Sequence, residues 1–395
     1  MGQISAAYRM LGGLRFMLAA VVLLSHTWFL WFGTSSPPFV QRIGIGNFGV
    51  MGFFVLSGFI IAEAIDVFYP RRPGAFLANR VLRLFPAYWA AAILSVAVHG
   101  VLSHFGILKL PDYETPPAVM YDWRNYLVQI TAIVPVLNFN RFLPRIEWYY
   151  FVRFAWAIFV EFAFYLYVAI CMTAWPAFRR FMGLTAYVSL CAAAALAIHL
   201  THEHGRHLHD AFQHVPYFVL GVAFYAVMTR PRNAAGWSFL VAGYLLAGMH
   251  FARYTQGQPS AWGNWTANFF TPEVLAPWCA MMLIPLIMLA LATWRRAPPH
   301  ITEMDRKLGD LTYPLYLNHY AVLVLVYSLV SVSSLWAQVV AIIGSIAVAM
   351  AMKSIVEQPL TSVRNSLRGT PLNSVEQNCD VRSSEKTNRL QQRLR

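Results

Sequence analysis

The sequence predicts an all-α polytopic membrane protein with about ten transmembrane helices and with both its N-terminus and its C-terminus in the cytoplasm. Of the 395 residues, 58% are hydrophobic and only 12% are charged, and the mean hydropathy is +0.50. A soluble domain is far less apolar and carries more charge. Apolar runs of membrane-spanning length follow one another up to about residue 357. Lysine and arginine are distributed unevenly between the segments that connect these runs, and this asymmetry orients the helices.

The apolar runs define the predicted helices in order along the chain. A hydrocarbon core of about 30 Å requires roughly 17 to 25 apolar residues per helix. This length predicts spans over 14–32, 45–65, 84–103, 148–173, 181–200, 214–229, 236–252, 273–293, 311–330 and 335–356. The stretch 124–143 is short, contains Pro135 and ends in polar residues, so we expect it to be a re-entrant or interfacial piece.

The distribution of basic residues supports ten spans with the N-terminus inside. In that arrangement the inner segments hold 20 of the 30 lysines and arginines, and the outer segments hold seven. Counting 124–143 as a full span would reverse every later segment and would place Arg179 and Arg180 outside, against the positive-inside rule. The net charge of +13 is explained by this bias and by a basic tail. Nucleic-acid binding is not indicated, because no basic cluster lies away from positions that flank the membrane.

The chain divides into a transmembrane domain over 1–360 and a basic, disordered cytoplasmic tail over 361–395. No small-residue cleavage site follows the first apolar run, so we expect that run to remain as a helix. The four cysteines form no CxxC pair and show no ligand-like spacing, so neither a disulfide framework nor a bound metal is expected. The sequence does not indicate an oligomeric state.

Arg15 and His26 mark the first span as unusual. Eleven residues of helix turn only some 20° past three full turns and rise about 16 Å, so both side chains lie on one stripe. Arg15 then sits near the inner mouth of the helix, and His26 lies at mid-membrane. Arg15 alone can simply extend to the lipid headgroups, and His26 can be a satisfied core histidine. An ionisable side chain at bilayer depth nevertheless favours a functional role for His26.

Arg80 and Arg83, three residues apart, share one helix face at the inner end of the third span. Such a pair can bind lipid headgroups or can clamp phosphate groups, for which the guanidinium fork is well suited. Arg15 on the same side of the membrane favours phosphates.

Further polar side chains occur within predicted spans. Glu161 lies in an otherwise aliphatic and aromatic helix and must be protonated or partnered. We expect His26 and His319 to be its partners. Tyr316 and His319 form an i, i+3 pair in the ninth span.

Two further patterns are interpreted conservatively. Gly49, Gly52 and Gly58 indicate close helix packing, to which Ser57 adds a hydrogen bond. The segment 199–214 contains six histidines but misses the metalloprotease pattern, because Arg206 stands where the second histidine would be required. We interpret it as a polar outer loop that titrates near neutrality, while a metal-binding tract is the alternative.

Six motifs, taken in order, resemble the integral-membrane acyltransferase-3 family over about residues 10 to 360. They are LRFMLAAVVLLSH (14–26), GVMGFFVLSGFII (49–61), the Arg80/Arg83 pair, WAIFVEFAFYLYV (156–168), LTYPLYLNHY (311–320) and VEQP (356–359). The spacing between Arg15 and His26 matches the family's signature in its first helix.

The resemblance implies transfer of an acyl group, usually acetyl, from cytoplasmic acetyl-CoA to a carbohydrate hydroxyl. It makes His26 catalytic, gives Arg15 a role in supporting His26 or the donor, and assigns Arg80 and Arg83 to coenzyme A. Glu161 is the candidate to orient the histidine, as the third group of a triad does. Ser57, Tyr316 and His319 are candidate substrate-binding or supporting residues. A surface polysaccharide, exopolysaccharide, lipopolysaccharide or lipo-oligosaccharide is the expected acceptor, and a bacterial inner membrane is the expected location.

Other functions also place ionisable groups inside the membrane. A transporter or flippase for an anionic or glycolipid substrate is the main alternative, although no inverted repeat of broken helices supports it. A non-catalytic membrane scaffold is the other. On the enzyme interpretation, the histidine can deprotonate the acceptor hydroxyl or can itself accept the acyl group.

Overall fold

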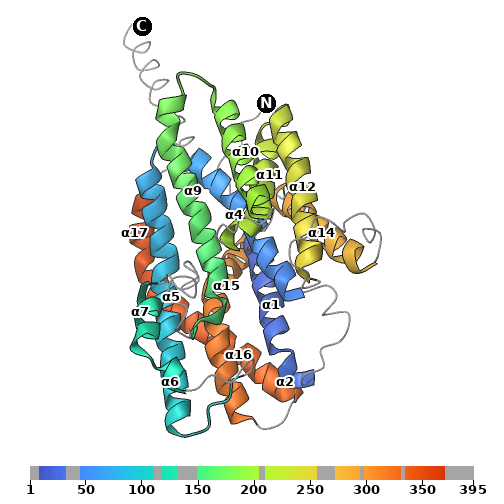
Figure 1. Cartoon of the computed structure of the whole chain (residues 1–395). Helices are drawn as coiled ribbons and strands as arrows, with labels where there is room; N and C mark the ends of the chain where they lie inside the picture. The colour runs from blue at the N-terminus through green and yellow to red at the C-terminus, as the bar shows by residue number, and fades with distance from the viewer. Residues whose placement is uncertain are drawn as a thin grey trace, which may run out of the picture.

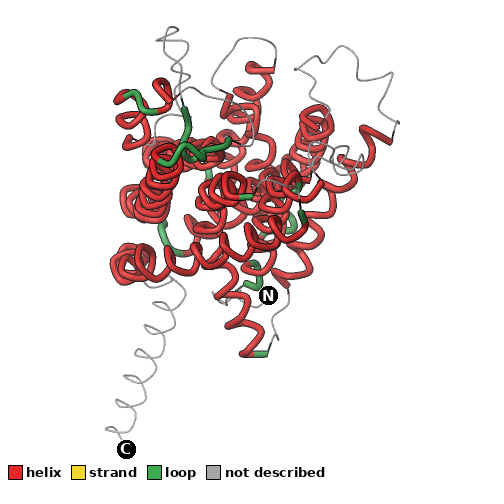
Figure 2. The backbone as a smooth tube through the Cα atoms, turned by 90° about the horizontal axis from the view of Figure 1, so that it is seen from below, coloured by secondary structure: helices red, strands yellow, loops and turns green. Residues whose placement is uncertain are grey.

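The computed structural model describes residues 9–32, 45–110, 117–131, 149–203, 210–255, 272–293, 298–330 and 334–369. Within these ranges the chain forms a bundle of helices without strands (Figures 1 and 2). The first half contains α1 (Gly12–Thr27), α2 (Phe29–Phe32), α4 (Ile45–Val67), α5 (Pro73–His104), α6 (Pro117–Met120), α7 (Trp123–Thr131), the short turn η1 (Arg153–Ala155) and α9 (Trp156–Phe178). The second half contains α10 (Leu184–Glu203), η2 (Asp210–His214), α11 (Val215–Thr229), α12 (Ala234–Thr255), α14 (Pro272–Thr293), α15 (Pro299–Leu329), α16 (Leu335–Met352), the π-helical turn η4 (Lys353–Glu357) and α17 (Gln358–Arg368).

The prediction of a polytopic helical membrane protein is confirmed. Eight helical segments in the described ranges are long and apolar enough to cross a membrane. The other two predicted spans correspond to α14 and α15. The apolar part of α14 is shorter and covers only Cys279–Leu291. α15 is less apolar, because it carries several tyrosines together with Asn318 and His319. The arrangement of helices therefore follows the predicted order.

Two helical segments extend beyond the predicted boundaries at the side predicted to be cytoplasmic. α5 begins at Pro73, a residue type suited to a first helical turn, rather than at residue 84. The chain also remains helical through Arg368, so the prediction of disorder over 361–368 is wrong. The composition of residues 361–368 is that of a solvated segment. The helix α17, to which they belong, is nevertheless held by packing against α5, and composition alone does not reveal such a contact. Of the interfacial stretch 124–143, the structure describes a part as the nine-residue helix α7, and residues 132–143 lie outside the described ranges.

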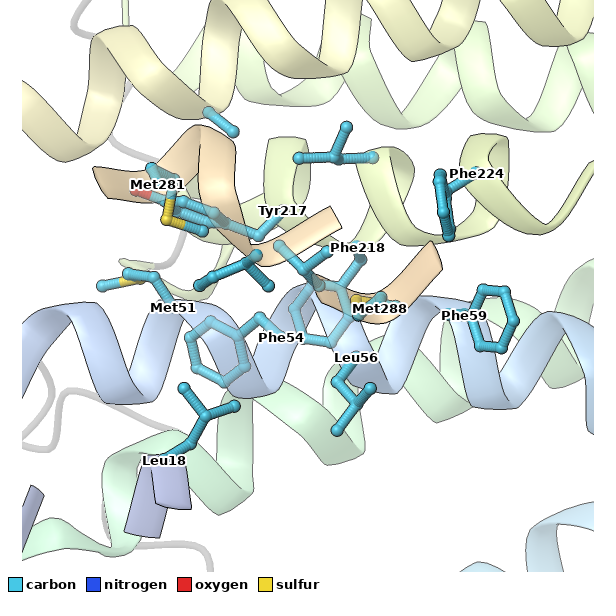
Figure 3. Packing of buried hydrophobic residues seen from close by; sticks show 14 of the residues in the cluster. Leu18, Met51, Phe54, Leu56, Phe59, Tyr217, Phe218, Phe224, Met281 and Met288 are labelled. Carbon is cyan, nitrogen blue, oxygen red and sulfur yellow. The ribbon is translucent and has the colours of Figure 1, made fainter. Parts of the chain in front are cut away.

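The largest apolar cluster lies where α4 packs against α1, α11 and α14 (Figure 3). Phe54 on α4 stacks on Phe218 of α11 with ring centroids 4.9 Å apart. At Gly58, an added Cβ would lie 2.3 Å from the Phe218 carbonyl oxygen. The close packing predicted for the glycines of this helix is therefore confirmed, since only a glycine permits this approach.

α1 is held parallel to α15 by polar contacts near the N-terminal ends of both helices. The Asp305 carboxylate accepts hydrogen bonds from the Gly12 and Gly13 amides at 2.9 and 2.6 Å. These amides belong to the first turn of α1, where no intrahelical acceptor is available and a negative charge is favourable. Gly309 approaches Gly12 closely: a Cβ added to Gly309 would lie 2.9 Å from the Cα of Gly12. These contacts set the register between the two helices that carry His26 and His319.

Candidate functional site

A single cavity brings together six of the eight residues selected from the sequence. Together with its open mouth, it contains about 790 Å³ of space not occupied by atoms. Helices α1, α4, α5, α9 and α15 each contribute to its wall. The six residues are Arg15, Ser57, Arg80, Arg83, Glu161 and Tyr316. Residues spread over some 300 positions of the chain therefore share one site.

Arg80 and Arg83 both line this cavity, as their predicted common face requires. Arg80 is only 7% exposed, and its guanidinium lies 5.6 Å from the ring centres of both Phe76 and Tyr165. Its Nε–H is buried without a hydrogen-bond acceptor among the described residues. A buried N–H group of a charged side chain without an acceptor is costly, so this end of the cavity suits an anionic ligand.

Glu161 accepts a hydrogen bond from the Ser57 hydroxyl at 2.6 Å and another from the Tyr165 hydroxyl. The hydrogen bond predicted for Ser57 is thus present. The expectation that His26 and His319 are the partners of Glu161 is wrong, because within the described residues the Glu161 carboxylate is bonded to these two hydroxyls instead. The α4 and α9 helices place Ser57 and Glu161 in contact, which spacing along the chain could not indicate.

His26 and His319 bond to each other. His26 Nδ1 lies 3.0 Å from His319 Nε2, and His319 Nδ1 lies 2.7 Å from the Tyr316 carbonyl oxygen. A carbonyl oxygen only accepts, so His319 Nδ1 carries the proton and Nε2 of the neutral ring accepts from His26 Nδ1. Neutral rings are the form that costs least to bury. His26 Nε2 is then left with a lone pair.

Aromatic contacts fix the planes of these two rings. Phe154 stacks on His26 with centroids 3.8 Å apart and planes 9° from parallel, and it also stacks on His319. The Tyr316 hydroxyl donates to the Phe154 carbonyl at 3.0 Å. Tyr316 also lines the cavity, so this tyrosine connects the histidine pair to the cavity wall.

The Arg15 guanidinium donates to the Gly309 carbonyl at 3.3 Å. Arg15 and His26 therefore both contact α15, and the prediction that they share one stripe of the first helix is confirmed. Arg15 lies at the cavity with Arg80 and Arg83, whereas His26 lies about three turns, or 16 Å, farther along α1.

Comparison with known families identifies the chain. A family model described as an acyltransferase domain matches residues 10–353. The chain belongs to the acyltransferase-3 family. No curated protein and no solved structure gives a significant match. The resemblance inferred from the six motifs is confirmed, and the protein is an acyltransferase of the membrane-embedded type.

The structure of this acyltransferase also contains residues near the site that sequence reasoning missed. Phe154 and Tyr165 are hidden within one aromatic-rich predicted span, of which the structure places Phe154 in η1 and Tyr165 in α9. Arg364 and Arg368 were assigned to the tail, yet they lie on α17 against α5. The sequence did contain a signal for this basic region. Four arginines lie on segments next to the predicted inner boundary, at positions 72, 80, 364 and 368.

The histidine-rich segment of the acyltransferase is only partly a loop. His199 lies on α10 and His214 ends η2, and both side chains are buried. The interpretation as a polar loop is therefore wrong for these two residues, while positions 204–209 lie outside the described residues. His214 packs with His250 of α12, with ring centroids 5.6 Å apart. In the described part of the chain, no group of three metal-ligating side chains is arranged to hold an ion.

Proposed function

We propose that this acyltransferase takes an acetyl group from acetyl-CoA at the cytoplasmic face and transfers it to a hydroxyl group of a carbohydrate. The carbohydrate is a surface polysaccharide, exopolysaccharide or lipopolysaccharide, or a lipo-oligosaccharide, and the enzyme acts in the inner membrane of a bacterium. The observation that carries the proposal is one cavity with an arginine-lined end, whose wall residue Tyr316 is hydrogen-bonded to the histidine pair that leaves a lone pair on His26 Nε2.

Coenzyme A suits the arginine end because its phosphates are strongly anionic, whereas its pantetheine arm is long and slim. Arg80 and Arg83 are placed to bind phosphate oxygens through charge-assisted hydrogen bonds. The arm then extends between α1, α4 and α15 toward Tyr316 and the histidine pair. The largely apolar walls contributed by Phe53, Phe54 and Ile60 suit this part of the donor.

Two routes of transfer use His26 Nε2. In direct transfer, Nε2 takes the proton of the acceptor hydroxyl while the hydroxyl oxygen attacks the thioester carbonyl. In the covalent route, Nε2 itself attacks the carbonyl, and the hydroxyl later removes the acyl group from the ring. In both routes the C–S bond breaks, and the coenzyme A thiolate leaves and is protonated. His319 orients His26 in both.

The donor role of the arginines is tested by replacing them together. In protein purified into lipid nanodiscs, the Arg80→Ala/Arg83→Ala variant should raise the apparent KM for acetyl-CoA by about tenfold or more, since each charge-assisted hydrogen bond contributes about 1.5–3 kcal/mol. The assay follows release of the free coenzyme A thiol. Arg179→Ala/Arg180→Ala is the matched control, because both residues are exposed and lie away from the cavity wall. An unchanged KM in the first variant would return Arg80 and Arg83 to a lipid-anchoring role.

A further inference from the structure

The last described helix, α17, covers the inner end of α5 and lies beyond the part of the chain that the family model matches. The Asn79 side-chain amide donates to the Arg364 carbonyl at 2.6 Å, and the Arg72 guanidinium donates to the Leu367 carbonyl at 3.0 Å. The Arg368 guanidinium stacks on the Phe68 ring at 3.6 Å. Because these contacts involve backbone atoms or Arg368, the position of α17 does not depend on the Arg364 side chain.

The Arg364 side chain lies within electrostatic reach of Arg83 and Arg80. Its Nε–H is buried and finds no hydrogen-bond acceptor in the described residues, as is true of Arg80. The charged groups that act on Arg364 are Arg83, Glu357, Arg80 and Asp310. Asp310 is paired with Lys353 at 3.2 Å. Two carboxylates, Glu357 and Glu161, then face the three guanidinium groups in this part of the described structure. The cluster therefore carries excess positive charge and has N–H groups to satisfy, both of which favour an anion.

The position of Arg364 along the membrane normal indicates which anion it meets. α17 runs opposite to α5, because residue 364 contacts residue 79 and residue 367 contacts residue 72. Asn79 lies four residues before Arg83, a rise of about 6 Å along the helix. The Arg364 backbone is thus level with Asn79, next to Arg80 and about one turn farther from the membrane centre than Arg83, and the Arg364 side chain is not among those that line the cavity.

The phosphates of coenzyme A are arranged in a matching order. The pyrophosphate follows the pantetheine arm directly, and the 3′-phosphate on the ribose lies farther from the thioester. We propose that Arg364 of α17 binds the 3′-phosphate of the acyl donor, while Arg80 and Arg83 bind the pyrophosphate. The inference rests on the proposed function, because it takes acyl-CoA as the donor. It assigns to the C-terminal helix the selection of coenzyme A over donors that lack the 3′-phosphate.

The test compares two donors that differ by one phosphate. Dissociation constants for acetyl-CoA and acetyl-3′-dephospho-CoA are measured on the full chain in nanodiscs, so no acceptor is required. The wild type should bind acetyl-CoA about tenfold more tightly. Arg364→Gln should remove this preference without weakening the dephosphorylated donor, and Arg364→Lys should retain part of it. Arg80→Ala/Arg83→Ala should weaken both donors equally, and Arg180→Ala, which removes an exposed arginine, should change neither.

The outcomes separate the inference from the proposed function. Binding of neither donor by the wild type would refute the proposed function and the inference with it. If the wild type binds both donors equally, or if Arg364→Gln weakens both to the same extent, donor binding stands and the role of Arg364 falls. A third arm repeats the measurements with and without phosphatidylglycerol in the nanodiscs. An effect of Arg364→Gln that occurs only with this anionic lipid would assign Arg364 to a lipid phosphate and would overturn the inference.

Discussion

At the scale of single residues, the tautomers of two histidines determine what the site can do. The Tyr316 carbonyl fixes the proton on His319 Nδ1, His319 Nε2 in turn fixes the proton on His26 Nδ1, and the lone pair is left on His26 Nε2. A carboxylate performs this orienting function in many triads. In the proposed mechanism a second imidazole, His319, takes that position, and Glu161 instead pairs with Ser57 and Tyr165.

Replacement of His26 tests the reacting group. His26→Ala should lower turnover by a factor of about 10² to 10⁴ or more, because it removes the base or nucleophile, while the protein remains inserted and folded. His104→Ala is the control, since His104 is exposed at the far end of α5. With radiolabelled acetyl-CoA alone, label retained on the wild type and lost in His26→Ala would indicate the covalent route, and no label would indicate direct transfer. Near-normal turnover by His26→Ala would contradict both routes.

Replacement of His319 tests the orienting group. His319→Ala should lower kcat less than His26→Ala does, because the reacting nitrogen remains but its tautomer is no longer fixed. His319→Gln should retain more activity than His319→Ala, since the amide oxygen can still accept from His26 Nδ1. The comparison requires kcat and KM for the donor, and KM should change little. Equal loss in the alanine and glutamine variants would show that His319 contributes packing alone.

At the scale of elements, close helix contacts hold the site together. α4 carries Ser57 and adjoins α11 at Gly58, where the α11 backbone occupies the space of a side chain. α1 and α15 are joined at Gly12, Gly309 and Asp305. Ser57 on α4, and the histidines on α1 and α15, therefore lie on helices whose separation is set by a small residue or a capping carboxylate.

The Gly58 crossing gives a prediction about stability. Gly58→Ala should destabilise the protein, because its Cβ would lie 2.3 Å from the Phe218 carbonyl oxygen and backbone atoms must move. Gly100→Ala is the matched control. Gly100 is helical with nothing within 4 Å of an added Cβ, and alanine there should stabilise by about 0.5–1 kcal/mol. Thermal unfolding in detergent measures both, and equal midpoints for the two variants would contradict the close crossing.

At the scale of the whole molecule, the orientation in the membrane decides which face meets the donor. The basic residues predict that the arginine cluster and α17 face the cytoplasm. α5 offers a test at its two ends, since Arg71 just before it and Phe105 just after it are both exposed. In a variant without the native cysteines, a membrane-impermeant maleimide should label Phe105→Cys in intact cells and Arg71→Cys only after permeabilisation. Labelling of position 71 in intact cells would refute this orientation.

Sequence reasoning succeeded where a property depends on local composition or on helical periodicity. Apolar length predicts the spans, because the bilayer core has a fixed thickness. The spacing between Arg15 and His26 predicts their common stripe, and that of Arg80 and Arg83 predicts their common face, because the helix repeat is constant. The order of the six motifs was sufficient for the family. These features need no knowledge of which helices are neighbours.

Tertiary structure alone decided the partners. Glu161 was expected to meet the histidines, but the way α9 packs against α4 places it beside Ser57. The composition of residues 361–368 predicts disorder, yet contacts with α5 stabilise α17 and bring Arg364 to the arginine cluster. Hydrogen bonds between helices depend on rotation and register at each crossing, and these are set by packing between residues far apart in the chain. The sequence by itself thus determined the helices, their polar stripes and the family, while the pairing of those stripes into one cavity required the fold.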